Sequence, residues 1–152
     1  MITEIFNEVE VIDKRFENWI QVVDFVREIF VNKKWSTKEY FEHIIKDMIE
    51  TKSYMVLAPG VVLLHSSPKN GAVDDAFHFI KLKYSVNFDH EHNDPVYAVI
   101  TFSVTDAKKH IESIQRLAYL LIDEEFMNEI RQNINRDELV NILCRYEKKT
   151  LQ

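Results

Sequence analysis

Apolar residues recur about every three to four positions towards both ends of the chain. Between residues 19 and 30 this spacing predicts an amphipathic helix, with Asp24 and Arg27 on its polar side. A second helix is expected from Ser36, because its hydroxyl and the Glu39 carboxylate match the pattern of a capping box. The helices predicted in the last third are 111–121, a short one around 126–130, and one that opens at Asn135 and Glu138.

The middle third consists of short runs rich in β-branched and aromatic residues, separated by Pro, Gly, Asn and Asp. The predicted strands are Tyr54–Leu57, Val61–Leu64, Phe77–Tyr84 and Val96–Val104. In the last run apolar side chains occupy both alternating faces, so both faces of the sheet must be covered. The order of the elements therefore predicts an α/β (α+β) fold, with a central sheet flanked by helices on both faces.

The composition limits the classes of protein that fit. The chain has 152 residues, of which 46% are hydrophobic, and we expect a single domain over residues 1–152. No run approaches the roughly 20 apolar residues of a membrane span, so we expect a cytoplasmic protein without a signal peptide or direct membrane insertion. A net charge of -6 argues against binding to nucleic acid. Cys144 is the single cysteine and has no partner for a disulfide.

Two of the six histidines stand where chemistry is expected. His65 ends the apolar run Val61–Leu64 and begins a polar loop, so we expect the sheet to hold it while its ring faces solvent. With an unperturbed pKa of about 6.5, such a ring offers an unprotonated nitrogen that can accept a phosphoryl group. His110 lies about one turn into the helix that Thr105 or Asp106 caps, on the side facing the sheet. There it should stay neutral and could donate a hydrogen bond to phosphate.

The other histidines have simpler interpretations. A histidine at a strand end is often structural, so that role is also open for His65. His43, within a helix, and His78, within a strand, are interpreted as residues at the edge of the core with one hydrogen-bond partner each.

The segment Asp89–Asp94 has a His-x-His pattern, in which His90 and His92 could bind one transition ion. A solvated acidic turn before Pro95 is the alternative. Because no third ligand can be identified elsewhere in the sequence, we assign no metal site.

Five segments form a recognisable series. They are Met55–His65, Pro68–Val73, Val86–His90, Asn93–Val96 and Asp106–His110. In this order and spacing they resemble the mannitol/fructose-type enzyme IIA of the bacterial phosphotransferase system. Leu57–Gly60 and Asn93–Val96 are most similar to its ascorbate-type branch. The similarity runs from about Trp19 to Leu143.

The resemblance implies a mixed sheet and a phosphotransferase that uses no nucleotide or other cofactor. In the family, the histidine matching His65 accepts a phosphoryl group from the phosphocarrier protein HPr and passes it to a cysteine of an enzyme IIB. The histidine matching His110 hydrogen-bonds that group, which agrees with the role expected from its helix position. HPr and the enzyme IIB of a carbohydrate or ascorbate uptake system are therefore the expected partners. The sequence also lacks the glycine-rich loop of nucleotide-using enzymes.

The site itself departs from the family, which usually reads Pro-His-Gly-Arg-Pro where residues 64–68 read Leu-His-Ser-Ser-Pro. Loss of the arginine removes a bidentate phosphate donor. We expect Ser66, Ser67 and Lys69, which is the nearest cation in the sequence, to support the phosphate instead. Slower transfer is the expected result. The alternative function is an enzyme IIA-like regulatory or interaction module with an impaired phosphorylation site.

Overall fold

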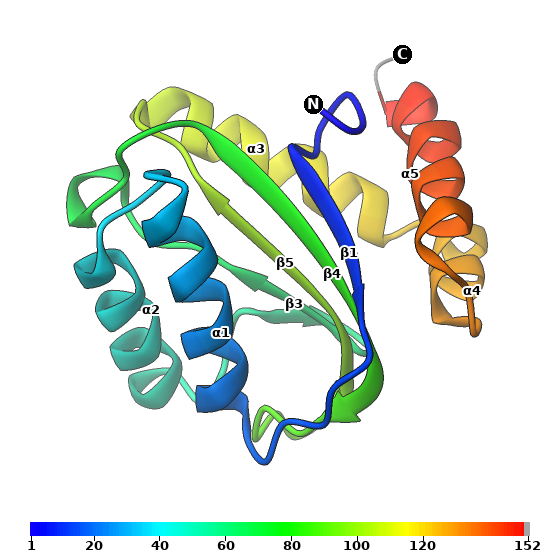
Figure 1. The fold of residues 1–152 in the computed structure, drawn as a ribbon, viewed down its shortest axis with the longest axis horizontal. Coiled ribbons are helices and arrows are strands. Elements are labelled where there is room, and N and C mark those ends of the chain that lie inside the picture. Colours follow the sequence, from blue (N-terminus) through cyan, green and yellow to red (C-terminus); the bar gives the residue numbers. More distant parts are fainter. Residues whose placement is uncertain (151–152) are drawn as a thin grey trace.

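A five-stranded sheet lies between two layers of helices in the computed structural model, which describes residues 1–150 (Figure 1). The strands are β1 (Glu8–Ile12), β2 (Val56–Ala58), β3 (Val61–Leu64), β4 (Ala76–Val86) and β5 (Val96–Ser103). The helices are α1 (Trp19–Asn32), α2 (Lys38–Glu50), α3 (Ala107–Leu121), α4 (Glu124–Arg131) and α5 (Arg136–Thr150), with a 3₁₀ turn η1 (Pro68–Asn70).

The sheet is mixed and its strands lie in the order β1-β4-β5-β3-β2. β1 is parallel to β4 and β3 is parallel to β5, whereas the β4–β5 and β2–β3 pairs are antiparallel. Together with the helices on both faces, this confirms the predicted α/β fold.

The sequence prediction of four strands was incomplete, because it lacked β1. Glu8, Val9 and Glu10 alternate in polarity, as in a strand with one buried face. Val9 is buried, whereas Glu8 and Glu10 are half-buried. Glu8 forms an ion pair with Lys33, and Glu10 accepts a hydrogen bond from His78. β1 lies at the edge of the sheet and pairs only with β4, so a short strand with alternating polarity is sufficient to complete the sheet.

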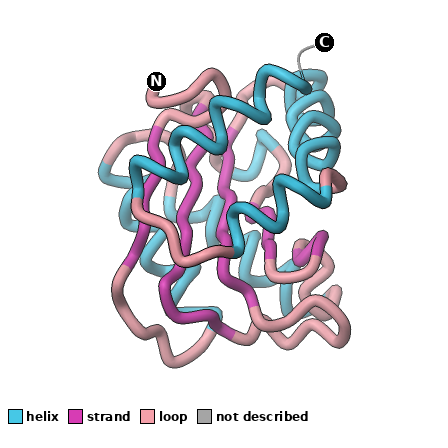
Figure 2. Tube along the Cα trace, turned by 90° about the vertical axis from the view of Figure 1, so that its right-hand side faces the viewer, coloured by secondary structure: helices cyan, strands magenta, loops and turns pink. Residues whose placement is uncertain are grey.

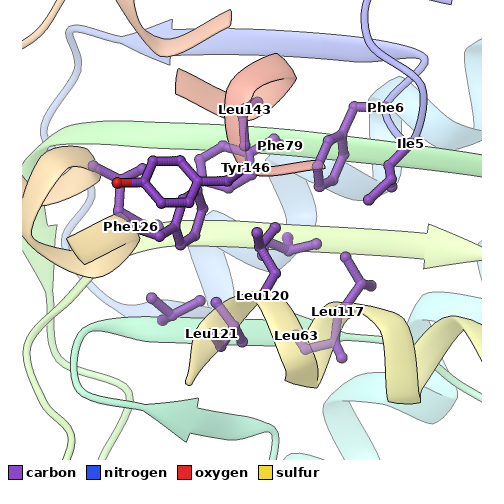
Figure 3. Packing of buried hydrophobic residues seen from close by; sticks show 14 of the residues in the cluster. Ile5, Phe6, Leu63, Phe79, Leu117, Leu120, Leu121, Phe126, Leu143 and Tyr146 are labelled. Atoms are coloured by element: carbon purple, nitrogen blue, oxygen red, sulfur yellow. The ribbon is translucent and has the colours of Figure 1, made fainter. Parts of the chain in front are cut away.

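Each face of the sheet has its own helices and its own core (Figure 1). Figure 2, a view from the side of α4 and α5, shows helices in front of the strands and behind them. α1 and α2 pack on one face through Val22, Phe30, Phe41 and Ile44. α3, α4 and α5 pack on the other through Leu117, Phe126 and Leu143, against Phe79 (Figure 3). β5 contributes Val99 to the first core and Ile100 to the second, which confirms that both of its faces are covered.

The starts of the helices agree only in part with the capping predictions. The capping box predicted at Ser36 is wrong: the N-cap of α2 is Thr37, and the Ser36 hydroxyl donates to the Thr37 carbonyl (3.1 Å). Ser36 still forms a β-bridge with Ala72, so its backbone lies one residue too early for a cap. At the start of α5, by contrast, the Glu138 amide donates to the Asn135 side chain (2.8 Å) and the Asn135 amide donates to Glu138 (3.2 Å).

The parallel pair β3 and β5 fixes where the site can form. Because the carboxyl ends of neighbouring parallel strands meet at one edge of a sheet, the segments that follow them lie together. His65 follows β3 directly, and α3 begins soon after β5. The loop of His65 and the first turn of α3 therefore meet at this edge.

Candidate functional site

His65 and His110 lie next to each other at this edge of the sheet. Their ring centroids are 5.7 Å apart and their planes are inclined at 49°. His110 lies in the first turn of α3, whose N-cap is Asp106, and the Asp106 side chain accepts a hydrogen bond from the Lys109 amide (2.8 Å). Of the two predicted caps, Thr105 and Asp106, the cap is Asp106. The two rings are adjacent, as the roles implied by the resemblance require.

The His65 ring is held on two sides. Its Nδ1 donates to the Leu63 carbonyl oxygen at 2.8 Å, and the ring stacks on Phe102 with centroids 5.4 Å apart and planes inclined at 7°. Because a carbonyl oxygen can only accept, the neutral ring must have its proton on Nδ1. The lone pair that could act as a nucleophile is therefore on Nε2.

His65 is more enclosed than the sequence suggested. Only 8% of the residue is exposed, so the expectation that the ring faces solvent is wrong. Phe102 covers one face, and the Tyr54 ring lies 6.3 Å away. Nε2, unlike Nδ1, makes no hydrogen bond within residues 1–150.

Both imidazoles favour the neutral form. Burial lowers the pKa of His65; the Leu63 carbonyl opposes this, and the neighbouring His110 lowers it further. Burial also lowers the pKa of His110. His110 Nδ1 is buried and has no hydrogen-bond partner in the described part of the chain. Since an unpaired buried nitrogen is unfavourable, this position suits a ligand that supplies a partner.

Tyr40 fixes the backbone that follows His65. From α2, its buried hydroxyl accepts a hydrogen bond from the Ser66 amide (3.0 Å) and donates to the Phe102 carbonyl (2.8 Å). It thereby connects the loop after β3 with β5, the strand that supplies the stacking ring. The sequence alone does not mark Tyr40 as part of the site, because there it is one of several apolar positions in an amphipathic helix.

Ser66, Ser67 and Lys69, the residues expected to support phosphate, have different surroundings. Ser66 is buried and its hydroxyl accepts a hydrogen bond from the Asn70 side chain (2.9 Å). Ser67 is half-buried and precedes η1, where its carbonyl accepts from the Asn70 amide (2.9 Å). Lys69 is exposed on η1. The two serines shape the loop, and phosphate support by all three residues stays a prediction.

A second anchor holds the turn before His110. Asp75 accepts hydrogen bonds from the Thr105 amide (2.9 Å) and from Lys109 Nζ (2.5 Å). Burial raises the pKa of Asp75, but its hydrogen bonds with Lys109 and Thr105 lower it by more. These contacts connect the segment before β4 with the start of α3, and so they position the turn that holds His110.

The chain was matched by the family model of the phosphoenolpyruvate-dependent sugar phosphotransferase system, EIIA 2, over residues 4–146. It belongs to this family. It is therefore an enzyme IIA-type phosphotransferase, as the resemblance of the sequence implied. An ascorbate-specific PTS system EIIA component of Shigella boydii is 30% identical over 130 residues, which are 85% of this chain and 84% of that protein.

Solved structures of enzyme IIA proteins share the fold. The solution structure of the mannitol-specific cryptic phosphotransferase enzyme IIA from Escherichia coli has a TM-score of 0.77 and 27% identity, and covers 91% of either chain. Enzyme IIAMTL of Escherichia coli, solved in complex with phosphorylated enzyme IIBMTL, has a TM-score of 0.73 and 17% identity over 90% of this chain and 94% of that chain. Within residues 1–150, no helix combines the length and apolarity that crossing a membrane requires.

Two further histidines of this enzyme IIA-type chain lie away from the site. His78 is buried, and its Nε2 contacts a Glu10 carboxylate oxygen at 2.8 Å, which confirms a single partner. His43 is exposed and its side chain makes no hydrogen bond in the described part of the chain, so its interpretation as a core-edge residue is wrong. The reason is its place on α2, where Phe41 and Ile44 face the core and His43 falls on the other side.

The segment Asp89–Asp94 is a turn that its own side chains stabilise. His90 Nδ1 accepts hydrogen bonds from the amides of His92 (3.2 Å) and Asn93 (3.0 Å), and Asp94 accepts one from the His90 amide (3.0 Å). Within residues 1–150 there is no group of three His, Cys, Asp or Glu side chains placed to hold a metal ion. The segment therefore forms a turn before Pro95, which was the alternative to a metal site.

Proposed function

We propose that His65 accepts a phosphoryl group on Nε2 from HPr and passes it to a cysteine of an enzyme IIB, in a cytoplasmic relay for carbohydrate or ascorbate uptake. One observation gives this proposal its main support. His65 has a fixed Nδ1–H and a free Nε2, and its ring lies 5.7 Å from that of His110. The whole chain, residues 1–152, would act as one domain without a cofactor.

The transfer needs little chemistry from the protein beyond positioning and charge stabilisation. The Nε2 lone pair of His65 would attack the phosphorus of the HPr phosphohistidine. The new N–P bond forms as the old one breaks, and the old bonding pair returns to the HPr ring. Throughout this step Nδ1–H can stay on the Leu63 carbonyl, while Phe102 keeps the ring plane fixed. A thiolate of enzyme IIB would then attack the same phosphorus and release His65 unchanged.

His110 would stabilise the charge of the phosphoryl group. Its Nδ1 is buried without a partner in the described part of the chain, and burial keeps the ring neutral by lowering its pKa. A neutral ring can donate one hydrogen bond to a phosphoryl oxygen. The free amides at the start of α3 add positive potential at the same place.

An enzyme IIB is the proposed acceptor, because Escherichia coli enzyme IIAMTL, a protein of this fold, forms a complex with phosphorylated enzyme IIBMTL. The surface around His65 is suited to such a partner. Tyr54, whose ring lies 6.3 Å from that of His65, and Ile111, next to His110, are large hydrophobic residues with exposed side chains. An exposed aromatic side chain beside a nearly enclosed nucleophile favours docking by a protein rather than by a free small molecule.

A regulatory or interaction module is the second candidate, and the loss of the arginine favours it. Ser67 stands where the family usually has an arginine. A phosphoryl group would then be stabilised weakly and transferred slowly. Such a module would need only HPr and a partner that responds to its phosphorylation state.

Incubation with phosphoenolpyruvate, enzyme I and HPr, followed by intact mass spectrometry, tests both candidates. Wild type should gain one phosphoryl group and His65→Ala should gain none. His43→Ala is the matched control and should behave like wild type, because His43 is exposed and lies outside the site. Loss of the phosphoryl group on addition of a cognate enzyme IIB supports the transport relay.

The other outcomes are equally specific. A phosphoryl group that persists in His65→Ala would place the acceptor on another residue. If wild type gains none, the module with an impaired site is the better description. If wild type is phosphorylated but no enzyme IIB discharges it, regulation is favoured over transport.

A further inference from the structure

Three aromatic rings surround His65, and each comes from a different part of the fold. The Phe102 ring of β5 is 5.4 Å from the imidazole, the His110 ring of α3 is 5.7 Å away and the Tyr54 ring 6.3 Å, all measured between ring centroids. These are the distances of packed aromatic pairs. In the sheet, β3 lies between β5 and β2, so Phe102 and the segment of Tyr54, which precedes β2, flank His65 on opposite sides. Together the rings explain why only 8% of His65 is exposed.

The three rings differ in how firmly they are held. Phe102 is fully buried, and His110 lies in the first turn of α3. Tyr54, by contrast, lies in the turn between α2 and β2, and 46% of it is exposed. Its hydroxyl makes no hydrogen bond within residues 1–150, whereas the buried hydroxyl of Tyr40 binds two segments of main chain. Tyr54 is therefore the ring on the solvent side of the enclosure and the one whose side chain is least tied to the fold.

The main chain before Tyr54 is strained and firmly anchored. Lys52 and Ser53 have φ values of 53° and 62°, a left-handed conformation that residues with a Cβ rarely adopt. Ser53 is buried; its amide donates to the Met48 carbonyl (2.8 Å) and its hydroxyl donates to the Phe88 carbonyl. Backbone in such a conformation persists only where the surrounding structure holds it, and it is frequent at functional sites. The turn thus fixes the point from which the Tyr54 side chain extends.

The sheet places this turn beside His65. β2 is antiparallel to β3, so the start of β2 lies at the end of β3, where His65 follows. The Met55 carbonyl accepts a hydrogen bond from the Leu63 amide (2.8 Å), and the Leu63 carbonyl accepts the one from His65 Nδ1. Tyr54 and His65 are therefore held next to the same pair of bonded residues, Met55 and Leu63.

We infer that Tyr54 controls access to His65, because its ring shields the imidazole, and a phosphoryl group bound to it, from water and other small reactants. The shielding of the imidazole does not depend on the proposed function, whereas the shielding of the phosphoryl group rests on it. In the hydrolysis that Tyr54 would slow, a water oxygen attacks the phosphorus and the N–P bond breaks. The bonding pair returns to His65 Nε2, and inorganic phosphate leaves with both protons of the water. Exclusion of water from a site suppresses such side reactions.

The simpler explanation is that Tyr54 is only an exposed contact for a partner protein. Its replacement would then slow phosphorylation by HPr without changing the reactivity of His65 towards small molecules. This explanation does not account for the strained turn that holds Tyr54 against His65, or for the low exposure of His65. The two explanations make different predictions for a reagent that needs no docking.

The first test uses diethyl pyrocarbonate, a small reagent that acylates neutral imidazole, on the unphosphorylated full chain at neutral pH. Peptide mass spectrometry measures the rate at each histidine. In Tyr54→Ala, His65 should react at least about threefold faster than in wild type, whereas Tyr54→Phe, which keeps the ring, should behave like wild type. The exposed His43 should react equally in all variants. The fully buried His78 should stay unreactive, which shows that the fold is intact.

Tyr119→Ala is the matched control, because it removes the same side chain outside the site. Tyr119 is 70% exposed on α3, nine residues beyond His110 and so roughly 13 Å further along the helix. The reactivity of His65 should not change in this variant. A rise as large as that in Tyr54→Ala would contradict a specific role of Tyr54.

The second test starts from protein phosphorylated with phosphoenolpyruvate, enzyme I and HPr, and follows the loss of the phosphoryl mass after these are removed. Tyr54→Ala should lose it at least about threefold faster than wild type, and Tyr54→Phe should not. Equal reactivity of His65 in wild type and Tyr54→Ala overturns the inference, and so does equal loss of the phosphoryl group. If diethyl pyrocarbonate reacts faster with Tyr54→Ala but wild type gains no phosphoryl group, control of access by Tyr54 is supported and the proposed function fails.

Discussion

At the scale of single residues, His65 combines a fixed tautomer with low exposure. Rotation of the ring would break the hydrogen bond to Leu63 and lose the stack on Phe102. Nε2 is therefore the nitrogen available for phosphorylation in the proposed reaction. Because burial lowers the pKa of His65, the nucleophilic neutral ring persists to a lower pH than in a free histidine. The same enclosure leaves space for few hydrogen-bond donors to a phosphoryl group, so each residue of the loop after His65 should affect the rate of transfer.

Ser67→Arg should speed phosphorylation of His65 by HPr. The residue has φ -58° and ψ 142°, an extended conformation that arginine before proline adopts readily. A guanidinium there would add a charge-assisted hydrogen bond to the transferring group, for a gain of about tenfold. The rate is measured by quenched mixing with phosphorylated HPr. Ser67→Gln, of similar length but neutral, should not be faster, and an unchanged rate in Ser67→Arg would contradict this explanation.

The sequence predicted some residues of the site and not others, for a physical reason. His65 and His110 could be identified because each stands at a recognisable point of its own element, a strand end and a helix start. Tyr40 and Phe102 could not, because their contacts are distant in sequence. The Tyr40 hydroxyl bonds to residues 26 and 62 positions away, and only the folded sheet brings these together.

At the scale of elements, the first turn of α3 should control the reaction through His110. Asp106→Ala removes the N-cap contact with the Lys109 amide, at a cost of about 1 kcal/mol. We expect Tm to fall by roughly 3 °C and phosphorylation to slow, because the turn that holds His110 frays. Both are measured on the purified variant by calorimetry and by the phosphorylation assay.

α4 offers the matched control for this variant. Its N-cap Asp123 accepts from the Phe126 amide (3.1 Å) in the same way, but no histidine lies in that helix. Asp123→Ala should lose a similar amount of stability and keep the wild-type phosphorylation rate. If both variants are slowed equally, the effect is one of general stability and not of His110.

The elements themselves were predictable where a long periodic pattern was present. All five helices follow such patterns, and strands β2 to β5 lie in runs of β-branched and aromatic residues separated by Pro, Gly, Asn and Asp, whereas β1 alternates glutamates with apolar residues. The cap of α2 shows a second kind of error. Ser36 has the right side chain for a cap, but its backbone pairs with Ala72, a contact between segments that no local pattern reveals.

At the scale of the whole molecule, the sheet separates two chemically different ends. One end presents two imidazoles whose pKa values burial lowers. The other presents Lys81 and Arg131 together with the carboxylates of Asp13, Asp94 and Glu138. β5 reaches from one end to the other, from Tyr97 to Phe102.

Lys81 should make the stability of the fold depend on pH. Its pKa is lowered from 10.5 to about 8 in the folded protein by burial and by Arg131, so the unfolded chain binds more protons between these values. Stability should therefore rise as pH increases through this window, by at most about 1.4 kcal/mol per pH unit. The free energy of unfolding in urea, measured at several pH values for wild type and Lys81→Met, gives the difference between the two. In this difference, the contributions of all other titrating groups cancel.

We expect the free energy of unfolding of wild type to increase relative to that of Lys81→Met as pH rises from 8 towards 10.5. Lys81→Met also loses the hydrogen bonds to Ile130 and Gln132, but that loss does not change with pH and leaves the slope intact. Parallel curves would show that the ammonium is not destabilised by folding.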